Sequence, residues 1–564
     1  MKLIVREYLA SLKERDELDA ILPDLLSQLG LNVFSRPGRG TRQDGVDIGA
    51  VGKLDGTVEK VYLFSVKAGD LTRREWDGDA IQSLRPSLNE ILDAYIPNRL
   101  PTEHRNKPVV ICVCVGGDIQ EQVRPSLEGF ISQNKKPLLS FEEWNGDKLA
   151  SLIQASFLRE DLLQHGAQSQ LRKSLAMLDD PDTSHRHFSK LLRMLADVKA
   201  SKPSQRLIAI RQISICLWIL FAWGREAQNM ESAYRSSELA LLLSWQIARL
   251  YVNKKSKIAE RINSAFLSIL LSYNQICTEY LVKRILPHAE KRDALSSAVR
   301  SPNSLDVNLK LFDVLGRIAM GGLWQVWHAR LLSDDDIDDR KELWAQHDRL
   351  AYLLKAFIAN NPTLNSPIKD DQAIDIWIAI FFLSLNRQNR DFVDNWLNEI
   401  ISRAHFAYVT HGKYPANLYA YNELLNHPKF GDTEYRENVT AGSILYPMIA
   451  SWAAFYELDD LYNEVTEFKS GCLQHCNFQF WFPDNFSETH FYDNSEPHGM
   501  VLSAVSTEQK MAEFLANLFA ECEQSLEYEN LSSVRSGLWP IILVACRHYR
   551  LPPPIHLMKE LHSS

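Results

Sequence analysis

The sequence predicts two regions of different fold class: an α/β domain at residues 1–158 and a large all-α region at residues 159–564. Three observations support this division. At 564 residues the chain exceeds the length that one hydrophobic core usually supports. A composition of 45% hydrophobic and 24% charged residues is typical of packed globular proteins. Short β-type apolar runs alternate with helical patterns only before about residue 160, and helical patterns alone follow.

In the first region a helical pattern at 16–29 stops before Gly30, a residue that favours a helix C-terminus. Apolar runs bounded by turn residues predict strands at 31–34, 46–51, 61–67, 109–115 and 137–140. Helical periodicity predicts further helices at 79–95 and 120–133. The run Val109 to Val115 is apolar throughout, which predicts a strand buried on both faces. We therefore expect a mixed sheet flanked by helices.

After residue 160, short polar breaks at 201–204, 301–303 and 360–362 separate long helical patterns. Segments 239–250 and 374–397 are apolar over wide faces, which predicts helices packed on several sides. No fixed repeat length is evident, so the region is expected to be a helical bundle or an irregular α-solenoid. A division into two subdomains is expected near residues 300–365.

Charge and cysteine content limit the functional classes. A net charge of -9 argues against a protein that coats nucleic acid non-specifically, so any nucleic-acid contact must be local. The eight cysteines form no disulfide framework, and the charged start of the chain does not resemble a secretory signal. Apolar runs such as Ile213 to Trp223 are shorter than the roughly 20 residues that span a bilayer. We expect a cytoplasmic protein with no membrane partner.

The residues with the most chemical content are Asp47 and Lys67, which lie on two predicted neighbouring strands. A carboxylate can ligate a divalent cation, and a lysine can orient or deprotonate an attacking water, and phosphodiester hydrolysis uses both. The sequence therefore predicts a nuclease active site. The alternative is that Asp47 caps a hairpin turn and that the Lys67 ammonium only extends into solvent.

The stretches Leu18 to Gly30, Gln43 to Ile48 and Phe64 to Lys67 resemble the PD-(D/E)xK nuclease superfamily, especially its Mrr-like restriction branch. The resemblance covers about residues 1–155. It implies a restriction-endonuclease-like fold for the first domain, Mg²⁺ or alternatively Mn²⁺ as cofactor, and endonuclease activity on DNA. It also implies a prokaryotic restriction or anti-phage defence setting.

Carried over residue by residue, the resemblance places the acidic helix residue of the family at Asp19 and its metal-binding aspartate at Asp47. The family lysine corresponds to Lys67, and the Val66 carbonyl is a further expected metal ligand. Ser65 stands where the family has Glu or Gln, and a hydroxyl is a poorer Mg²⁺ ligand than a carboxylate. A catalytically degenerate nuclease fold that serves as a nucleic-acid or protein docking module therefore stays open. Asp19 could also merely complement the dipole of its helix.

Basic and polar residues flank the predicted site and suit phosphate contacts. They are Arg36, Arg39 and Arg42 in the loop before the motif strands, Arg73 and Arg74 after Lys67, and Gln82 on the next helix. The helical region is expected to regulate, sense or assemble. Because no phosphate-binding P-loop is present in the sequence, an ATPase would have to be a partner chain. A partner sensor protein and a homo-oligomer are also compatible with the sequence, and so is RNA in place of DNA.

Overall fold

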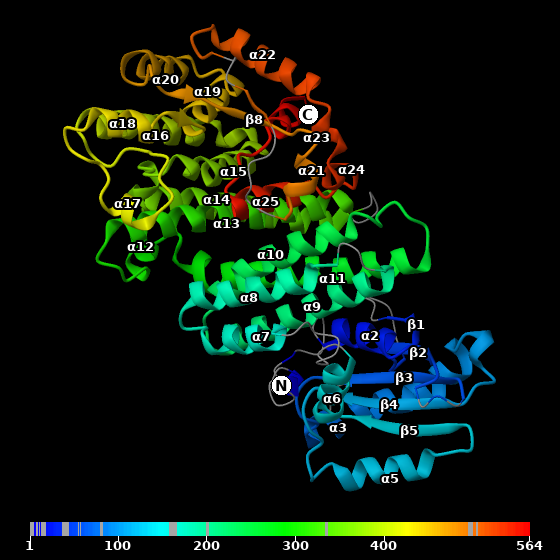
Figure 1. The fold of residues 1–564 in the computed structure, drawn as a ribbon. Helices are drawn as coiled ribbons and strands as arrows, with labels where there is room; N and C mark the ends of the chain where they lie inside the picture. The colour runs from blue at the N-terminus through cyan, green and yellow to red at the C-terminus, as the bar shows by residue number, and fades with distance from the viewer. Residues whose placement is uncertain are drawn as a thin grey trace. The chain divides into compact units, whose positions relative to one another are not determined.

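The computed structural model describes residues 5–6, 9–10, 12, 18–36, 44–54, 56, 58–78, 83–156, 166–198, 202–332, 337–493, 500–502 and 506–563 (Figure 1). The chain forms two compact units. The first comprises Met1–Ala240 and Asn253–Ser272, and the second comprises Leu241–Val252 and Tyr273–Ser564. Helices α10 (Glu231–Ala248) and α11 (Lys257–Tyr280) contribute residues to both units.

The first unit contains the predicted mixed sheet. Its five strands lie in the order β1 (Asn32–Ser35), β2 (Ile48–Gly52), β3 (Lys60–Lys67), β4 (Val109–Val115) and β5 (Leu139–Trp144). The first three are antiparallel neighbours, and β3, β4 and β5 are parallel. The prediction of an N-terminal mixed sheet with helices is confirmed. Strand β4 has the predicted bounds, whereas β5 continues beyond the predicted 137–140 to Trp144.

Both faces of the sheet are covered, as the apolar β4 run predicted. On one face Leu63 and Ile111 join a buried core with Trp76 and Leu88. On the other face the ring of Phe64 meets that of Trp144 edge to face at 5.0 Å. The two sets of side chains lie on opposite faces because successive residues of a strand point to opposite sides of the sheet.

Helices and helical turns surround the sheet. They are α2 (Asp19–Gln28), α3 (Arg73–Asp77), α4 (Leu84–Glu90), η2 (Ile91–Arg99), η3 (Thr102–His104), α5 (Arg124–Asn134) and α6 (Gly146–Ser156). The helix expected at 79–95 is α-helical only from Leu84 to Glu90 and continues as a π-helix to Arg99. Pro97 lies inside this π-helical stretch, where it lacks the N–H needed for regular α-helical bonding.

Beyond residue 166, the described residues of the first unit are mostly helical. They include α7 (Ala167–Ala176), α8 (Pro181–Ala196), α9 (Pro203–Glu226) and parts of α10 and α11. Helix α9 extends beyond the apolar run Ile213 to Trp223, and its 24 residues are long and apolar enough to cross a bilayer. However, 89% of its apolar window is buried inside the structure. This degree of burial is typical of a helix in a protein core.

The second unit is predominantly helical, as predicted. Its longer helices are α13 (Ser304–Leu331), α14 (Ile337–Asn360), α15 (Ala373–Ser384), α16 (Arg390–Val409), α19 (Leu445–Phe455), α20 (Asp459–Cys472), α22 (Met511–Gln524) and α25 (Pro540–Tyr549). Shorter helices are α12 (Ala294–Ala298), α17 (Tyr421–Leu425), α18 (Thr433–Val439), α21 (Ser487–His490), α23 (Glu527–Asn530), α24 (Ser532–Arg535) and α26 (His556–Ser563). Helical turns η4 to η8 occupy Leu281–Ile285, Leu286–His288, Pro362–Asn365, Asp370–Gln372 and Arg387–Asn389.

Two small sheets that the sequence analysis did not predict interrupt this helical region. Strand β6 (Gly442–Ser443) pairs with β7 (Asn477–Phe478), and β8 (Phe480–Phe482) pairs with β9 (Met500–Leu502). The segment around β7 and β8 is rich in aromatic residues, which favour extended backbone.

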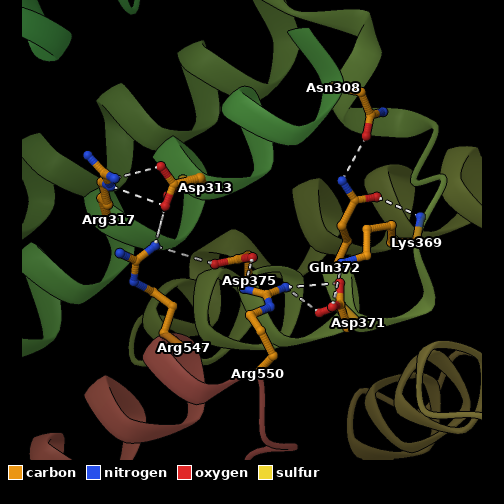
Figure 2. A network of polar contacts seen from close by, with 9 residues as sticks. All are labelled: Asn308, Asp313, Arg317, Lys369, Asp371, Gln372, Asp375, Arg547 and Arg550. Carbon is orange, nitrogen blue, oxygen red and sulfur yellow. Dashed lines mark hydrogen bonds and ion pairs between the residues drawn. The ribbon is translucent and has the colours of Figure 1, made fainter. Parts of the chain in front are cut away.

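A network of charged side chains, of which Arg317, Asp375 and Arg547 are buried, joins helices α13, α15 and α25 (Figure 2). The Asp313 carboxylate forms ion pairs with Arg317 at 2.7 Å and with Arg547 at 2.8 Å. Asp375 pairs with Arg550 at 2.8 Å. Although burial acts to raise it, the charges of Arg317, Lys310 and Arg547 hold the pKa of Asp313 well below its usual value. At Asp375, by contrast, burial raises the pKa, and the charges of Arg550 and Arg547 oppose this effect.

Candidate active site

Strands β2 and β3 bring Asp47 beside the end of the strand that carries Lys67. Ile48 pairs with Phe64 in the antiparallel ladder, and Asp47 immediately precedes this pair. The Asp47 N–H donates to the Phe64 carbonyl at 2.9 Å. Lys67 is the last residue of β3. The two predicted site residues thus lie at the same end of the β2–β3 hairpin.

The Asp47 side chain replaces the next main-chain partner in the ladder. Its Oδ2 accepts a hydrogen bond of 2.7 Å from the Val66 N–H. Because the N–H and C=O of one strand residue point to the same edge, the Val66 carbonyl also faces the β2 side. The Val66 carbonyl therefore lies on the edge of β3 at which the Asp47 carboxylate is bound.

The loop that leads into Asp47 is held against the neighbouring helical segment. Asp44 has a φ of 46° and pairs with Arg99 of η2 at 2.5 Å. Gly45 has a φ of 80°, and a Cβ at this position would lie 2.0 Å from the Ser87 carbonyl oxygen. Only glycine fits both the backbone conformation and the close approach. Gly45 is therefore a point of tight packing.

Ser65 and Lys67 share one face of β3, because alternate residues of a strand point the same way. Leu63 on that face belongs to the buried core. The exposed fraction is 2% for Ser65 and 7% for Lys67. A lysine buried to this extent does not fit the alternative in which the side chain merely extends into solvent.

The charge of Asp47 extends to the neighbouring strand. Cys114 of β4 lies opposite Val66 in the parallel register. Burial, followed by the negative charge of Asp47, raises the pKa of the Cys114 thiol well above its usual value. This thiol therefore stays protonated and is not a candidate nucleophile or metal ligand.

Further carboxylates, which were not predicted as site residues, follow the parallel strands. The Asp118 N–H donates to Asp70 Oδ1 at 2.8 Å, and the Asp118 carboxylate pairs with Arg6. Gly117 makes this arrangement possible, since a Cβ there would lie 2.2 Å from Asp70 Oδ1. The available signal was a repeated Gly-Asp pair after each parallel strand, at 69–70, 117–118 and 146–147. Asp70 and Asp118 serve to fasten the strand ends together.

The remaining predicted residues are distributed as follows. Asp19 is the first residue of α2, but its side chain lies outside the described residues. Arg36 directly follows β1, and Arg73 and Arg74 begin α3, and all three are exposed. The other three, Arg39, Arg42 and Gln82, lie outside the described residues.

A buried polar contact between α2 and α9 was also not predicted. Arg211 of α9 is 4% exposed, donates to Gln28 at 3.1 Å and lies 3.9 Å from Asp24. Burial raises the pKa of Asp24, an effect that the charges of Arg211 and Arg36 oppose. The available signal was a single arginine within an otherwise apolar stretch of helix. This contact fixes the helix that carries Asp19 to the helical part of the same unit.

The donor set around Asp47 fits a cation that keeps most of its water. Among the described residues no group of three or more His, Cys, Asp or Glu side chains is placed to hold a metal. Mg²⁺, however, is commonly bound through one or two carboxylates and retains several waters. Asp47 and the Val66 carbonyl could supply oxygen ligands of that kind. The role of Asp19 as a further ligand stays a prediction.

Comparison with known proteins adds no relative: no protein-family model, curated protein or solved structure matches this chain.

Proposed function

We propose that the chain is a Mg²⁺-dependent nuclease that cuts DNA and has a restriction-endonuclease-like first domain. The helical region would regulate the enzyme or assemble it in a prokaryotic restriction or anti-phage defence system. The observation that carries this proposal is the hydrogen bond from the Val66 N–H to Asp47, which holds an oxygen-donor acid beside the strand end that carries Lys67.

Each residue has a distinct task in the proposed reaction. Asp47 and the Val66 carbonyl would bind the cation, with Asp19 as a candidate further ligand. Lys67 would orient the attacking water and accept or share its proton. Ser65 would support the position of Lys67 through its hydroxyl. Bound there, Mg²⁺ would activate a water and neutralise charge on the phosphate.

The function is tested by incubation of the purified protein with supercoiled plasmid and Mg²⁺ or Mn²⁺, with EDTA as a control. Asp47→Asn and Lys67→Met should each lower the cleavage rate about 100-fold or more, since each removes one catalytic group. Asp93→Asn and Lys53→Gln are matched controls on exposed residues of the same domain and should cut at the wild-type rate. Equal cleavage by all five proteins would reject the assignment.

The second candidate is a nuclease fold without catalysis that docks nucleic acid or another protein. The observation that favours it is Ser65, a buried hydroxyl where the resembled family carries Glu or Gln. This candidate predicts that Ser65→Glu leaves the protein silent in the plasmid assay, whereas a weak nuclease should cut faster with the added carboxylate ligand.

A further inference from the structure

Helices α7 and α8 of the first unit pack side by side (Figure 1). Together they expose a concentration of positive charge. The exposed basic residues are Arg172 and Lys173 on α7 and Arg186, Lys190 and Arg193 on α8. We call these five residues the α7–α8 basic face. It belongs to a chain of net charge -9, so it is a local departure from the overall charge.

The basic residues of α8 form a stripe. Arg186, Lys190 and Arg193 follow at spacings of four and three residues, which places them along one side of the helix. Phe188 and Leu191 are buried on its apolar side. At 1.5 Å per residue the stripe runs for about 10 Å.

The positive charges gather around one side chain. His187 bonds to Gln170 of α7, with 2.8 Å between Nδ1 and Oε1. Burial, followed by the positive charges of Lys173, Lys190 and Arg186, lowers the pKa of His187. Within the described part of the chain, Lys173, Arg186 and Lys190 form no ion pair.

Two carboxylates lie at the N-terminal end of α8, and each has a partner besides the basic face. The charge of Arg186 also helps to lower the pKa of Asp180. Asp180 accepts a hydrogen bond from the Thr183 N–H as the helix N-cap, and Asp182 pairs with Arg235 of α10. The positive charge of the face is therefore only partly compensated by these groups.

The face is also held rigidly. The Ser184 hydroxyl donates to the Ser174 carbonyl at 2.8 Å and lies 2.7 Å from the Ser232 hydroxyl. These buried contacts join α7, α8 and α10. A surface that is ordered in advance loses less entropy when it binds.

We propose that the α7–α8 basic face binds the phosphate backbone of double-stranded DNA. This inference rests on the proposed nuclease function and extends it by naming a second contact with the substrate, outside the sheet. One strand of a duplex carries one phosphate per about 3.4 Å of axis, so a stripe of about 10 Å spans roughly three phosphates. Contacts of this kind position the DNA and carry no sequence information.

The test measures the affinity of the protein for a fluorescein-labelled duplex of roughly 30 base pairs by fluorescence anisotropy. EDTA is present to prevent cleavage, and the measurement is repeated at several salt concentrations. Arg186→Gln/Lys190→Gln should weaken binding about tenfold or more and lower the log–log salt slope by about 2, because two phosphate contacts are lost. Lys135→Gln/Lys136→Gln removes the same charge from exposed residues just before β5 and should bind like the wild type.

Two results would overturn the inference: equal binding by the two double variants, or no duplex binding by the wild type. Binding of labelled polyglutamate is measured in the same way. If Arg186→Gln/Lys190→Gln loses polyglutamate binding and keeps duplex binding, the inference is also overturned, because the face would then bind an acidic protein. The assay is independent of cleavage. A protein that binds through this face but never cuts would overturn the proposed nuclease and leave the DNA contact standing.

Discussion

The Val66 N–H of β3 donates a hydrogen bond of 2.7 Å to the carboxylate of Asp47, the residue directly before β2. An asparagine can accept the same bond through its amide oxygen, but it carries no charge. Substitution by asparagine therefore separates the contribution of this hydrogen bond to stability from the contribution of the negative charge to the proposed chemistry.

Asp47→Asn should leave the free energy of unfolding close to that of the wild type, whereas Asp47→Leu should lower it by about 1–2 kcal/mol. The second variant leaves the Val66 N–H without its acceptor. Thermal and urea denaturation of both variants checks this difference. Equal destabilisation by Asn and Leu would show that the hydrogen bond is not what holds Asp47 in place.

Gly45→Ala should destabilise the first unit by about 2 kcal/mol or more, since it combines an unfavourable φ with overlap on the Ser87 carbonyl. Gly56 offers a matched control: its φ is 78°, but a Cβ there would meet nothing within 4 Å. Gly56→Ala should show only the backbone cost. If both variants shift the denaturation midpoint equally, the close approach at Gly45 contributes nothing.

Arg547→Met should lower the free energy of unfolding of the second unit by about 3 kcal/mol, because Asp313 and Asp375 lose a buried cationic partner. Lys559, which pairs with the exposed Glu523, provides the comparison. Lys559→Met should leave the denaturation midpoint nearly unchanged. A small effect of Arg547→Met would mean that the network in Figure 2 is dispensable for stability.

His556 should make the second unit sensitive to acid. Burial lowers the pKa of His556 to about 4, and its ring stacks on Tyr528 at 4.4 Å. Because the folded pKa lies below the unfolded value of about 6.5, the stabilisation is present above pH 6.5 and is lost as pH falls towards 4. Between pH 7 and about 4.5 the loss should be about 2 kcal/mol.

His556→Phe should remove this part of the pH dependence. Asp370 acts in the opposite sense, because burial raises its pKa to about 6 and its contribution is lost as pH rises from 3.8 to 6. The comparison of His556→Phe with the wild type, by urea denaturation at both pH values, isolates the histidine. If the free energy of unfolding depends on pH in the same way for the two proteins, His556 is not the cause of the acid sensitivity.

The sequence was most informative where a local pattern decides the structure. The apolar run of β4 specified a strand buried on both faces, and the apolar runs of β2 and β3, bounded by turn residues, specified the two neighbouring strands that position Asp47 and Lys67. The division between a mixed sheet and a helical region followed from the same periodicities. The catalytic role of these residues stays a prediction.

What the sequence did not specify depends on contacts between distant residues. The packing of Gly45 on Ser87 and the burial of Arg211 beside Asp24 involve segments that no local pattern relates. The same holds for Asp70, whose side chain bonds to Asp118 across 48 residues. The change to a π-helix at Ile91 depends on main-chain geometry that periodicity alone does not distinguish.

Titration with Mn²⁺, with free Mn²⁺ measured by electron paramagnetic resonance, tests the nuclease proposal most directly. The wild type should bind about one ion per chain, in competition with Mg²⁺. Asp47→Asn should bind at least about tenfold more weakly while it keeps its fold. Equal binding by the two proteins, or none by the wild type, would contradict the proposal that Asp47 holds a catalytic cation.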